Sequence, residues 1–100
     1  YKIYLSPKSP KTPFKFELSN AKTKEAEFRL YSSNKSILKV PRSMIKLFGN
    51  QFQDIELKFE VEKRGFNTFK INEEDFFIIL AVTDGSDVWT YLFELEGLDG

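Results

Sequence analysis

The sequence predicts an all-β fold, a small pseudo-barrel of about seven strands with one short α-helix. Two observations lead to this prediction. Most of the chain consists of short segments in which apolar and polar residues alternate, which is the pattern of half-buried strands. The 100 residues also include eleven Phe, and aromatic residues are favoured in strands. At this length we expect one domain, residues 1–100, that buries its core without a metal or a disulfide.

The first strands are predicted from alternation in residues 1–5, 14–18 and 26–30. Residues 6–13 hold three prolines and no other apolar residue. Such a segment is typical of an exposed, extended arm or linker. We therefore expect a Pro-rich arm at 6–13 and the barrel core at 14–95.

The stretch 36–49, SILKVPRSMIKLFG, predicts a short apolar strand followed by the one helix, residues 41–48. Pro41 fits the first helical position, where its missing N–H would be unpaired anyway. Gly49 fits the position just past the last turn, where a left-handed conformation is common. The apolar side chains that would share one face of this helix are Met44, Ile45 and Phe48.

The second half predicts four further strands, at 54–61, 66–71, 76–83 and 88–95. Residues 54–61 alternate most clearly, with Ile55, Leu57, Phe59 and Val61 on the core side. Residues 76–83 are apolar on both faces, which favours a central strand. The Asp84-Gly85 pair indicates a tight hairpin. In the last strand one side carries Trp89, Tyr91, Phe93 and Leu95, of which we expect Trp89 and Tyr91 to be partly exposed.

The two halves of the chain carry opposite charge. Residues 1–50 hold eleven Lys/Arg and three Glu, a balance of +8, whereas residues 51–100 hold four Lys/Arg and twelve Asp/Glu, a balance of −8. Such asymmetry can indicate a basic face for an anionic partner. It also fits strands of the two halves that pair so that opposite charges meet. The sequence leaves both interpretations open.

Composition removes several kinds of active site. The chain has no Cys and no His, so thiol nucleophiles, Cys/His zinc sites and imidazole bases are absent. The five glycines are scattered and form no phosphate loop. The acidic turn residues Asp75, Asp84 and Asp87 lack the spacing of a calcium loop. We expect no enzyme activity, no metal and no cofactor.

One alternative keeps catalysis open. Glu56 and Lys58 lie two residues apart on one strand face, the pairing with which a small Mg²⁺-dependent nuclease holds its metal and activates water. Such a site needs a second carboxylate from an earlier strand, and only Glu17, Glu25 and Glu27 precede. Charged residues on the solvent face of a strand also produce this pattern by chance.

Basic residues and amides form three groups. The first, on loops and strand ends near residues 19–36, contains Lys22, Lys24, Arg29, Asn34 and Lys35. The second, on the polar side of the predicted helix, contains Arg42 and Lys46, and the third, on the hairpin near 62–67, contains Lys63, Arg64 and Asn67. If the groups converge, Arg and Asn would contact base edges and Lys would contact phosphates. The alternative is a solvated surface.

The order of the segments resembles a B3-like DNA-binding domain. The resemblance rests on a strand ending in Leu18-Ser19, a polar arm, Ile-Leu-Lys-Val-Pro at 37–41, and Leu47-Phe48-Gly49, followed by a last hairpin. The strand-Pro-helix-Gly piece is also similar to AbrB/MazE-like swapped-hairpin proteins. The B3 resemblance implies a pseudo-barrel that grips the major groove with two arms. The first arm would hold Asn20, Lys22, Lys24, Asn34 and Lys35, and the second Lys63, Arg64 and Asn67.

The leading hypothesis is therefore a non-catalytic module of a larger protein that binds double-stranded DNA. The second hypothesis is an accessory β-domain that binds a protein partner and no nucleic acid, with an exposed aromatic patch near Trp89. The third is the small nuclease. No apolar run reaches the roughly 18 residues that span a bilayer, so we expect no membrane partner, and we expect a cytoplasmic location. The sequence leaves the oligomeric state undetermined.

Overall fold

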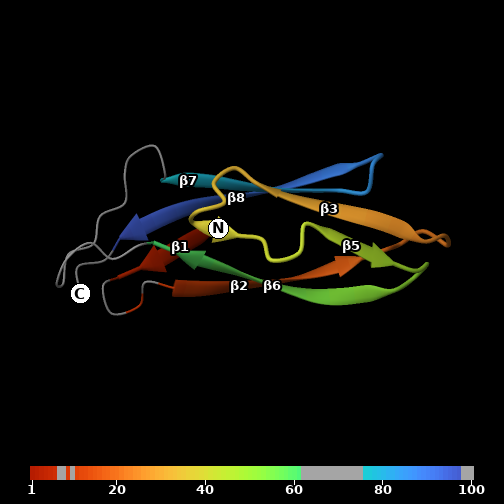
Figure 1. The fold of residues 1–100 in the computed structure, drawn as a ribbon, viewed down its shortest axis with the longest axis horizontal. Coiled ribbons are helices and arrows are strands. Elements are labelled where there is room, and N and C mark those ends of the chain that lie inside the picture. The colour runs from red at the N-terminus through yellow and green to blue at the C-terminus, as the bar shows by residue number, and fades with distance from the viewer. Residues whose placement is uncertain (7–8, 10, 62–75, 98–100) are drawn as a thin grey trace.

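The computed structural model describes residues 1–6, 9, 11–61 and 76–97, and it is all-β in these ranges (Figure 1). Eight strands form two sheets that curl around one core as an open half-barrel. The predicted hairpin at 62–65 and the predicted strand at 66–71 lie outside the described residues. The all-β class is thus confirmed.

The larger sheet has five strands in the order β1-β8-β7-β3-β5. Their bounds are β1 Lys2–Leu5, β8 Val88–Gly97, β7 Phe77–Thr83, β3 Ala26–Ser32 and β5 Met44–Leu47. The smaller sheet has the order β2-β6-β4, with β2 Lys11–Ser19, β6 Phe52–Glu60 and β4 Leu38–Lys39. All strand pairs are antiparallel except β1 with β8, which is parallel.

The core lies between the two sheets, and alternation places its residues there. The apolar side chains predicted on the core side of residues 54–61 are all buried: Ile55, Leu57 and Phe59 on β6, and Val61 just after it. The facing sheet contributes Ile78, Leu80, Val82, Phe93 and Leu95. The rings of Phe59 and Phe93 meet across the sheets edge to face, with centroids 4.8 Å apart. This contact joins the two layers at the centre of the molecule.

The last hairpin is as predicted. β7 lies between β8 and β3, so it is an interior strand of its sheet. Gly85 has a φ of 95° in the turn, a conformation that glycine adopts at low cost. The Asp84 carboxylate accepts hydrogen bonds from the Ser86 and Asp87 N–H groups at 2.9 and 2.8 Å. These bonds close the turn between β7 and β8.

The predicted helix at 41–48 is wrong, because this segment contains strand β5. Ile45 and Leu47 are buried while Met44 and Lys46 are exposed, which is the period of a strand and not of a helix. The backbone pairs with β3 along the whole of β5. A short apolar run fits the period of a helix and that of a strand, and here the pairing with β3 makes the segment a strand.

Glycine is needed at position 49 for a different reason than the helix cap that we predicted. A Cβ atom at this position would collide with the backbone of Thr23. The left-handed residue of the turn is Asn50, with a φ of 62°, a conformation that Asn tolerates better than most residues. Glycine at position 49 therefore allows the β5–β6 turn to approach the β2–β3 loop closely.

The Pro-rich arm at 6–13 is shorter than predicted, because β2 already begins at Lys11. The Asn20 N–H donates to the Gln51 carbonyl, which places the hydrogen-bonding groups of even-numbered β2 residues toward β6. The backbone N–H and C=O groups of odd-numbered residues therefore point to the outer edge of the sheet. Pro13 is at one of these positions. A proline that lacks an N–H is tolerated at such a position.

Asn20 is the one buried polar residue among those described, with an exposed fraction of 3%. Its side-chain nitrogen lies 2.9, 3.0 and 3.1 Å from the carbonyl oxygens of Lys24, Leu47 and Phe48. Its side-chain oxygen accepts the N–H of Lys22. Asn20 thus ties the end of β2 to the end of β5 and to the loop between β2 and β3.

Replacing Asn20 with Ala should lower the free energy of unfolding by about 1–3 kcal/mol, because buried carbonyls lose their donor. Asn20→Asp should cost more at neutral pH, because a carboxylate would face the same carbonyls. Urea unfolding measures both changes, with the exposed Ser19→Ala as the control. An Asn20→Ala variant as stable as Ser19→Ala would contradict the role of this side chain.

Candidate functional site

The structure places the basic residues of the first group apart from one another. Lys22 and Lys24 are exposed on the loop between β2 and β3. Arg29 lies on the outer face of β3, and Lys46 lies on the outer face of β5, where it pairs with Glu27. Asn34 and Lys35 follow β3 at the end opposite to that loop. Arg29 and Lys46 thus share the outer face of the larger sheet, whereas the other basic residues lie in the loops at its two ends.

Asn20, which the B3 resemblance placed on a solvent-facing arm, is instead inside the protein with its amide engaged. The Asn34 side-chain oxygen accepts the N–H groups of Ser36 and Ile37 at 3.0 and 3.3 Å. Both amides therefore hold local backbone. The third group, Lys63, Arg64 and Asn67, lies outside the described residues.

The register of β2 with β6 places the loop that carries Lys22 at one end of the smaller sheet. Ser19 pairs with Phe52, and Lys11 pairs with Glu60. The loop therefore lies beside the start of β6. The other end of this nine-residue strand, Glu60, lies roughly 27–30 Å away.

Several cations are paired with carboxylates inside the molecule. Lys22 meets Asp84 at 3.1 Å, Lys39 meets Glu60 at 3.0 Å, and Lys11 meets Glu60 at 3.9 Å. Each of these pairs joins the basic first half to the acidic second half. The fourth pair, Arg29 with Glu27 at 3.5 Å, lies within the first half. The charge asymmetry of the sequence is thus in part internal pairing.

Neighbouring groups lower the pKa values of two carboxylates, Asp84 and Glu60. The Ser86 and Asp87 N–H groups, with Lys22, lower the pKa of Asp84 to about 2, and the bond from Asp87 has the largest effect. The hydrogen bond from Lys39 lowers the pKa of Glu60, assisted by the charges of Lys11 and Lys58 and opposed by burial. Both carboxylates are stabilised in their charged form.

Of the carboxylates in the nuclease alternative, Glu17 and Glu56 lie on the outer face of the smaller sheet, whereas Glu25 is in the β2–β3 loop and Glu27 is on β3 of the larger sheet. Glu17 pairs with Asp54, and Lys15 pairs with Glu56. They line a dent of about 400 Å³ together with Phe16 and Ile55. Among the described residues no three His, Cys, Asp or Glu side chains are grouped closely enough to hold a metal ion. The face therefore presents interleaved charges of both signs.

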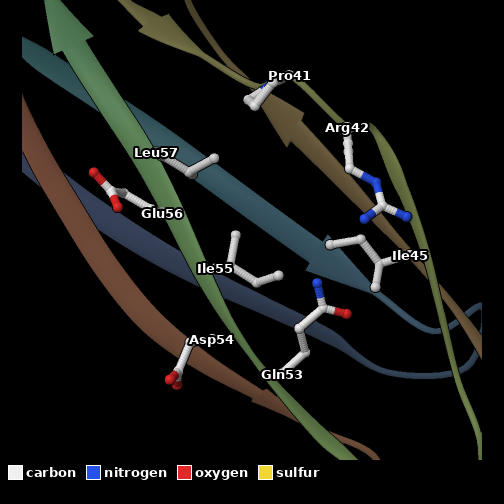
Figure 2. Close-up of a pocket in the computed structure, with 8 residues that line it drawn as sticks. All are labelled: Pro41, Arg42, Ile45, Gln53, Asp54, Ile55, Glu56 and Leu57. Atoms are coloured by element: carbon white, nitrogen blue, oxygen red, sulfur yellow. The ribbon is translucent and has the colours of Figure 1, made fainter.

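A second hollow lies between β5 and β6, and Figure 2 shows the Arg42 side chain directed over Ile45 toward Gln53. Its volume is about 130 Å³, whereas pockets for small molecules are typically about 300–1,000 Å³. Arg42, a predicted DNA-binding residue, is exposed at its rim. This hollow marks the place where the two sheets separate.

An exposed apolar surface lies on the outer side of β7 and β8. We call it the β7–β8 surface and define it by four exposed side chains, Phe77 (59%), Ile79 (44%), Val88 (65%) and Leu92 (53%). Ile79 is directly opposite Leu92 in the sheet, and Tyr31 on the neighbouring β3 is also exposed. Exposed apolar patches of a few hundred Å² on monomers are often functional.

The other side of β8 is apolar as well. Trp89 is 44% exposed, which confirms the partial exposure predicted for it, and Tyr91 is half-buried. The Tyr91 ring lies 5.4 Å from that of Phe16 across the gap to β2. We did not predict the exposure of Phe77, Ile79, Val88 and Leu92. Apolar residues on both faces of 76–83 and 88–93 were the signal for it.

No family model and no curated protein matches this chain. Within the described part of the chain, no helix is long and apolar enough to cross a membrane. The function is therefore inferred from the surfaces of the domain itself.

The state of Asp84 predicts how stability depends on pH. Its carboxylate stays charged in the folded protein down to about pH 2, whereas in the unfolded chain it takes up a proton near its usual pKa of 3.8. Its contribution is therefore complete above about pH 4 and is lost as the pH falls toward 2. Asp84→Asn should lose less stability over this range than the wild type, as measured by urea midpoints.

Asp87→Asn, in the same turn, is the matched control and should follow the wild-type dependence. An identical loss for wild type and Asp84→Asn would show that this carboxylate does not stabilise the turn.

Proposed function

We propose that this domain is a non-catalytic interaction module that binds a protein partner through the β7–β8 surface. The observation that carries the proposal is the cluster of Phe77, Ile79, Val88 and Leu92, exposed on two paired strands of a rigid sheet. Burying such side chains against a partner is favourable by roughly 25 cal/mol per Å². A sheet also presents them without a large loss of conformational entropy on binding.

The polar surfaces of the domain support this proposal over duplex-DNA binding. Lys22, Lys39 and Lys11 already meet carboxylates, and Asn20 is buried. DNA binding stays a prediction. It is supported by exposed basic side chains such as Lys24, Lys35, Arg42 and Lys46. They lie on several elements: Lys24 in the β2–β3 loop, Lys35 after β3, Arg42 before β5 and Lys46 on β5.

The first test is selection from a phage-displayed random peptide library on the immobilised domain. We expect enriched clones whose affinity falls at least about tenfold with Leu92→Asp, because a charge would then be buried at the contact. Phe52→Asp is the matched control, since Phe52 is 66% exposed on the outer face of the other sheet. It should leave binding unchanged.

Both variants should unfold at the same denaturant concentration as the wild type, because neither side chain is in the core. Enrichment no greater than on a protein-free support, or equal losses with both variants, would contradict the proposal.

The second test addresses DNA directly by fluorescence anisotropy of a labelled random-sequence duplex in a salt series. We expect no binding at about 50 mM salt, because counterion release from phosphate contacts would be small. Binding that weakens with salt at a slope of about 0.9 per phosphate contact would instead support the DNA hypothesis. Lys24→Glu and Lys46→Glu would then locate the contact.

A further inference from the structure

We propose that the element of the partner that binds the β7–β8 surface is an amphipathic α-helix, which lies along β7 with its N-terminal end near Glu94 and its C-terminal end near Arg29. This inference rests on the proposed function and names the form of the partner. It follows from the pairing of the strands, from the dimensions of the apolar strip on this face and from the charges at the two ends of that strip.

The β7–β8 surface is a sheet face whose strands are already paired. β7 lies between β8 and β3, and it pairs with β8 from Phe77 to Thr83. A partner that lies over β7 therefore contacts side chains, and it must satisfy its own N–H and C=O groups when it excludes water. An isolated extended strand cannot do this, whereas an α-helix pairs these groups within itself.

The apolar strip is as wide as one helix. The β7–β8 surface and Tyr31 lie over three neighbouring strands, β8, β7 and β3. Three strands span about 10 Å, which is about the diameter of an α-helix. The next strands outward, β1 and β5, expose Lys2, Tyr4, Met44 and Lys46 on this face. The flat sheet of a second copy would bury both lysines, at a cost in solvation, whereas one helix leaves them in water.

The length of the strip also fits a helix of ordinary size. β7 runs from Phe77 to Thr83 and has seven residues, which span about 20 Å. Over this distance an α-helix contains about 13 residues, or roughly three to four turns. One side of such a helix presents apolar residues at positions i, i+3, i+4 and i+7. The partner helix therefore needs one apolar face of this length.

The two ends of the strip carry charges of opposite sign. At one end Glu94 lies opposite Phe77, and Glu96 follows it on the same face of β8. At the other end Arg29 lies opposite Thr83. The side chains of all three charged residues are exposed, so each charge can act on a partner that lies over the strip.

Neighbouring charges reduce this difference but do not remove it. Lys2 lies opposite Glu94, which leaves the acidic end with two carboxylates and one lysine. Arg29 meets Glu27 at 3.5 Å, and Glu27 pairs with Lys46, which leaves the basic end with two cations and one carboxylate. The acidic end thus keeps a net charge of −1 and the basic end a net charge of +1.

These charges match the ends of a helix. The N-terminus of an α-helix carries about half a positive charge, and its C-terminus carries about half a negative charge. A helix that begins near Glu94 and ends near Arg29 places each of its ends beside the opposite charge. The helix therefore runs in the direction of β7.

The probe is a synthetic peptide of about 14 residues, held helical by a hydrocarbon cross-link on its polar side, with Leu along one face and paired Lys and Glu elsewhere. Its control has the same composition and cross-link but no leucine face. In a fluorescence titration we expect the control to bind at least about tenfold more weakly, because burial of a single Leu already corresponds to such a factor.

A charge variant tests how the ends of the strip are read. Glu94→Lys should weaken binding of the probe roughly two- to fivefold, because it places a positive charge beside the helix N-terminus. Glu56→Lys, the same change on the outer face of the smaller sheet, is the matched control and should leave the affinity unchanged. The difference between the two variants should disappear in about 1 M salt, where charges are screened within about 3 Å.

Paramagnetic tags test the direction of the helix. A tag at the N-terminal end of the peptide should broaden the amide signals of Phe77 and Glu94 in the isotope-labelled domain. A tag at the C-terminal end should broaden those of Arg29 and Val88. The opposite pattern would overturn the proposed placement of the helix.

Equal affinities of the probe and its control, or binding of the probe that Leu92→Asp leaves unchanged, would overturn the helix as the partner element. If phage-selected peptides lost affinity with Leu92→Asp but were extended on the domain by their carbon chemical shifts, this inference would fail while the proposed function stood. A dimer in sedimentation equilibrium that Leu92→Asp dissociates would also overturn it, because a second copy would then cover the surface.

Discussion

The hydrogen bonds of Asn20 are the constraint on which one end of the sandwich depends. At this end the chain leaves β2 in one sheet, crosses to β3 in the other, and later turns from β5 back to β6. Each crossing exposes carbonyls that no ladder can satisfy. The Asn20 amide serves both crossings, because it lies within hydrogen-bonding distance of the Lys24 carbonyl in the β2–β3 loop and of the Leu47 and Phe48 carbonyls at the end of β5. The backbone N–H of Asn50 donates back to the Asn20 and Lys22 carbonyls, so the two turns form one unit.

This unit also determines where the basic loop lies. With Gly49 against the backbone of Thr23 and the Asn50 N–H bonded to the Lys22 carbonyl, the β2–β3 loop packs on the β5–β6 turn. Lys22 then lies within 3.1 Å of Asp84 on the β7–β8 turn, although 62 positions separate them in the chain. An amide and a lysine that look like nucleic-acid ligands in the sequence thus hold three turns together. Asn and Lys suit both nucleic-acid binding and contacts within the fold, and only the position of the backbone shows which of the two roles they have.

The sequence predicts the strands and their inward faces well, because alternation is a local property. It places Ile55, Leu57 and Phe59 in the core, and it identifies the hairpin at Asp84-Gly85. The sequence prediction fails at 41–48. The four residues of β5 fit the period of a helix as well as that of a strand, and their pairing with β3 makes them a strand. It also fails at Pro13, whose compatibility with a strand depends on being at an edge. Edge position and exposure arise from the arrangement of the sheets, so apolar residues on both faces of 76–83 and 88–93 signalled a second apolar face but not that this face would be exposed.

The same dependence on arrangement explains why β7 and β8 carry exposed apolar side chains. A strand that is apolar on both sides belongs in the centre of a fold, with layers on both faces. The inner faces of β7 and β8 pack on the core, whereas no layer of the described residues covers Ile79 and Leu92 on the outer face. The composition of these strands therefore suits a more enclosed environment than the described residues provide. Under the proposed function, a protein partner would supply the missing layer over Ile79 and Leu92.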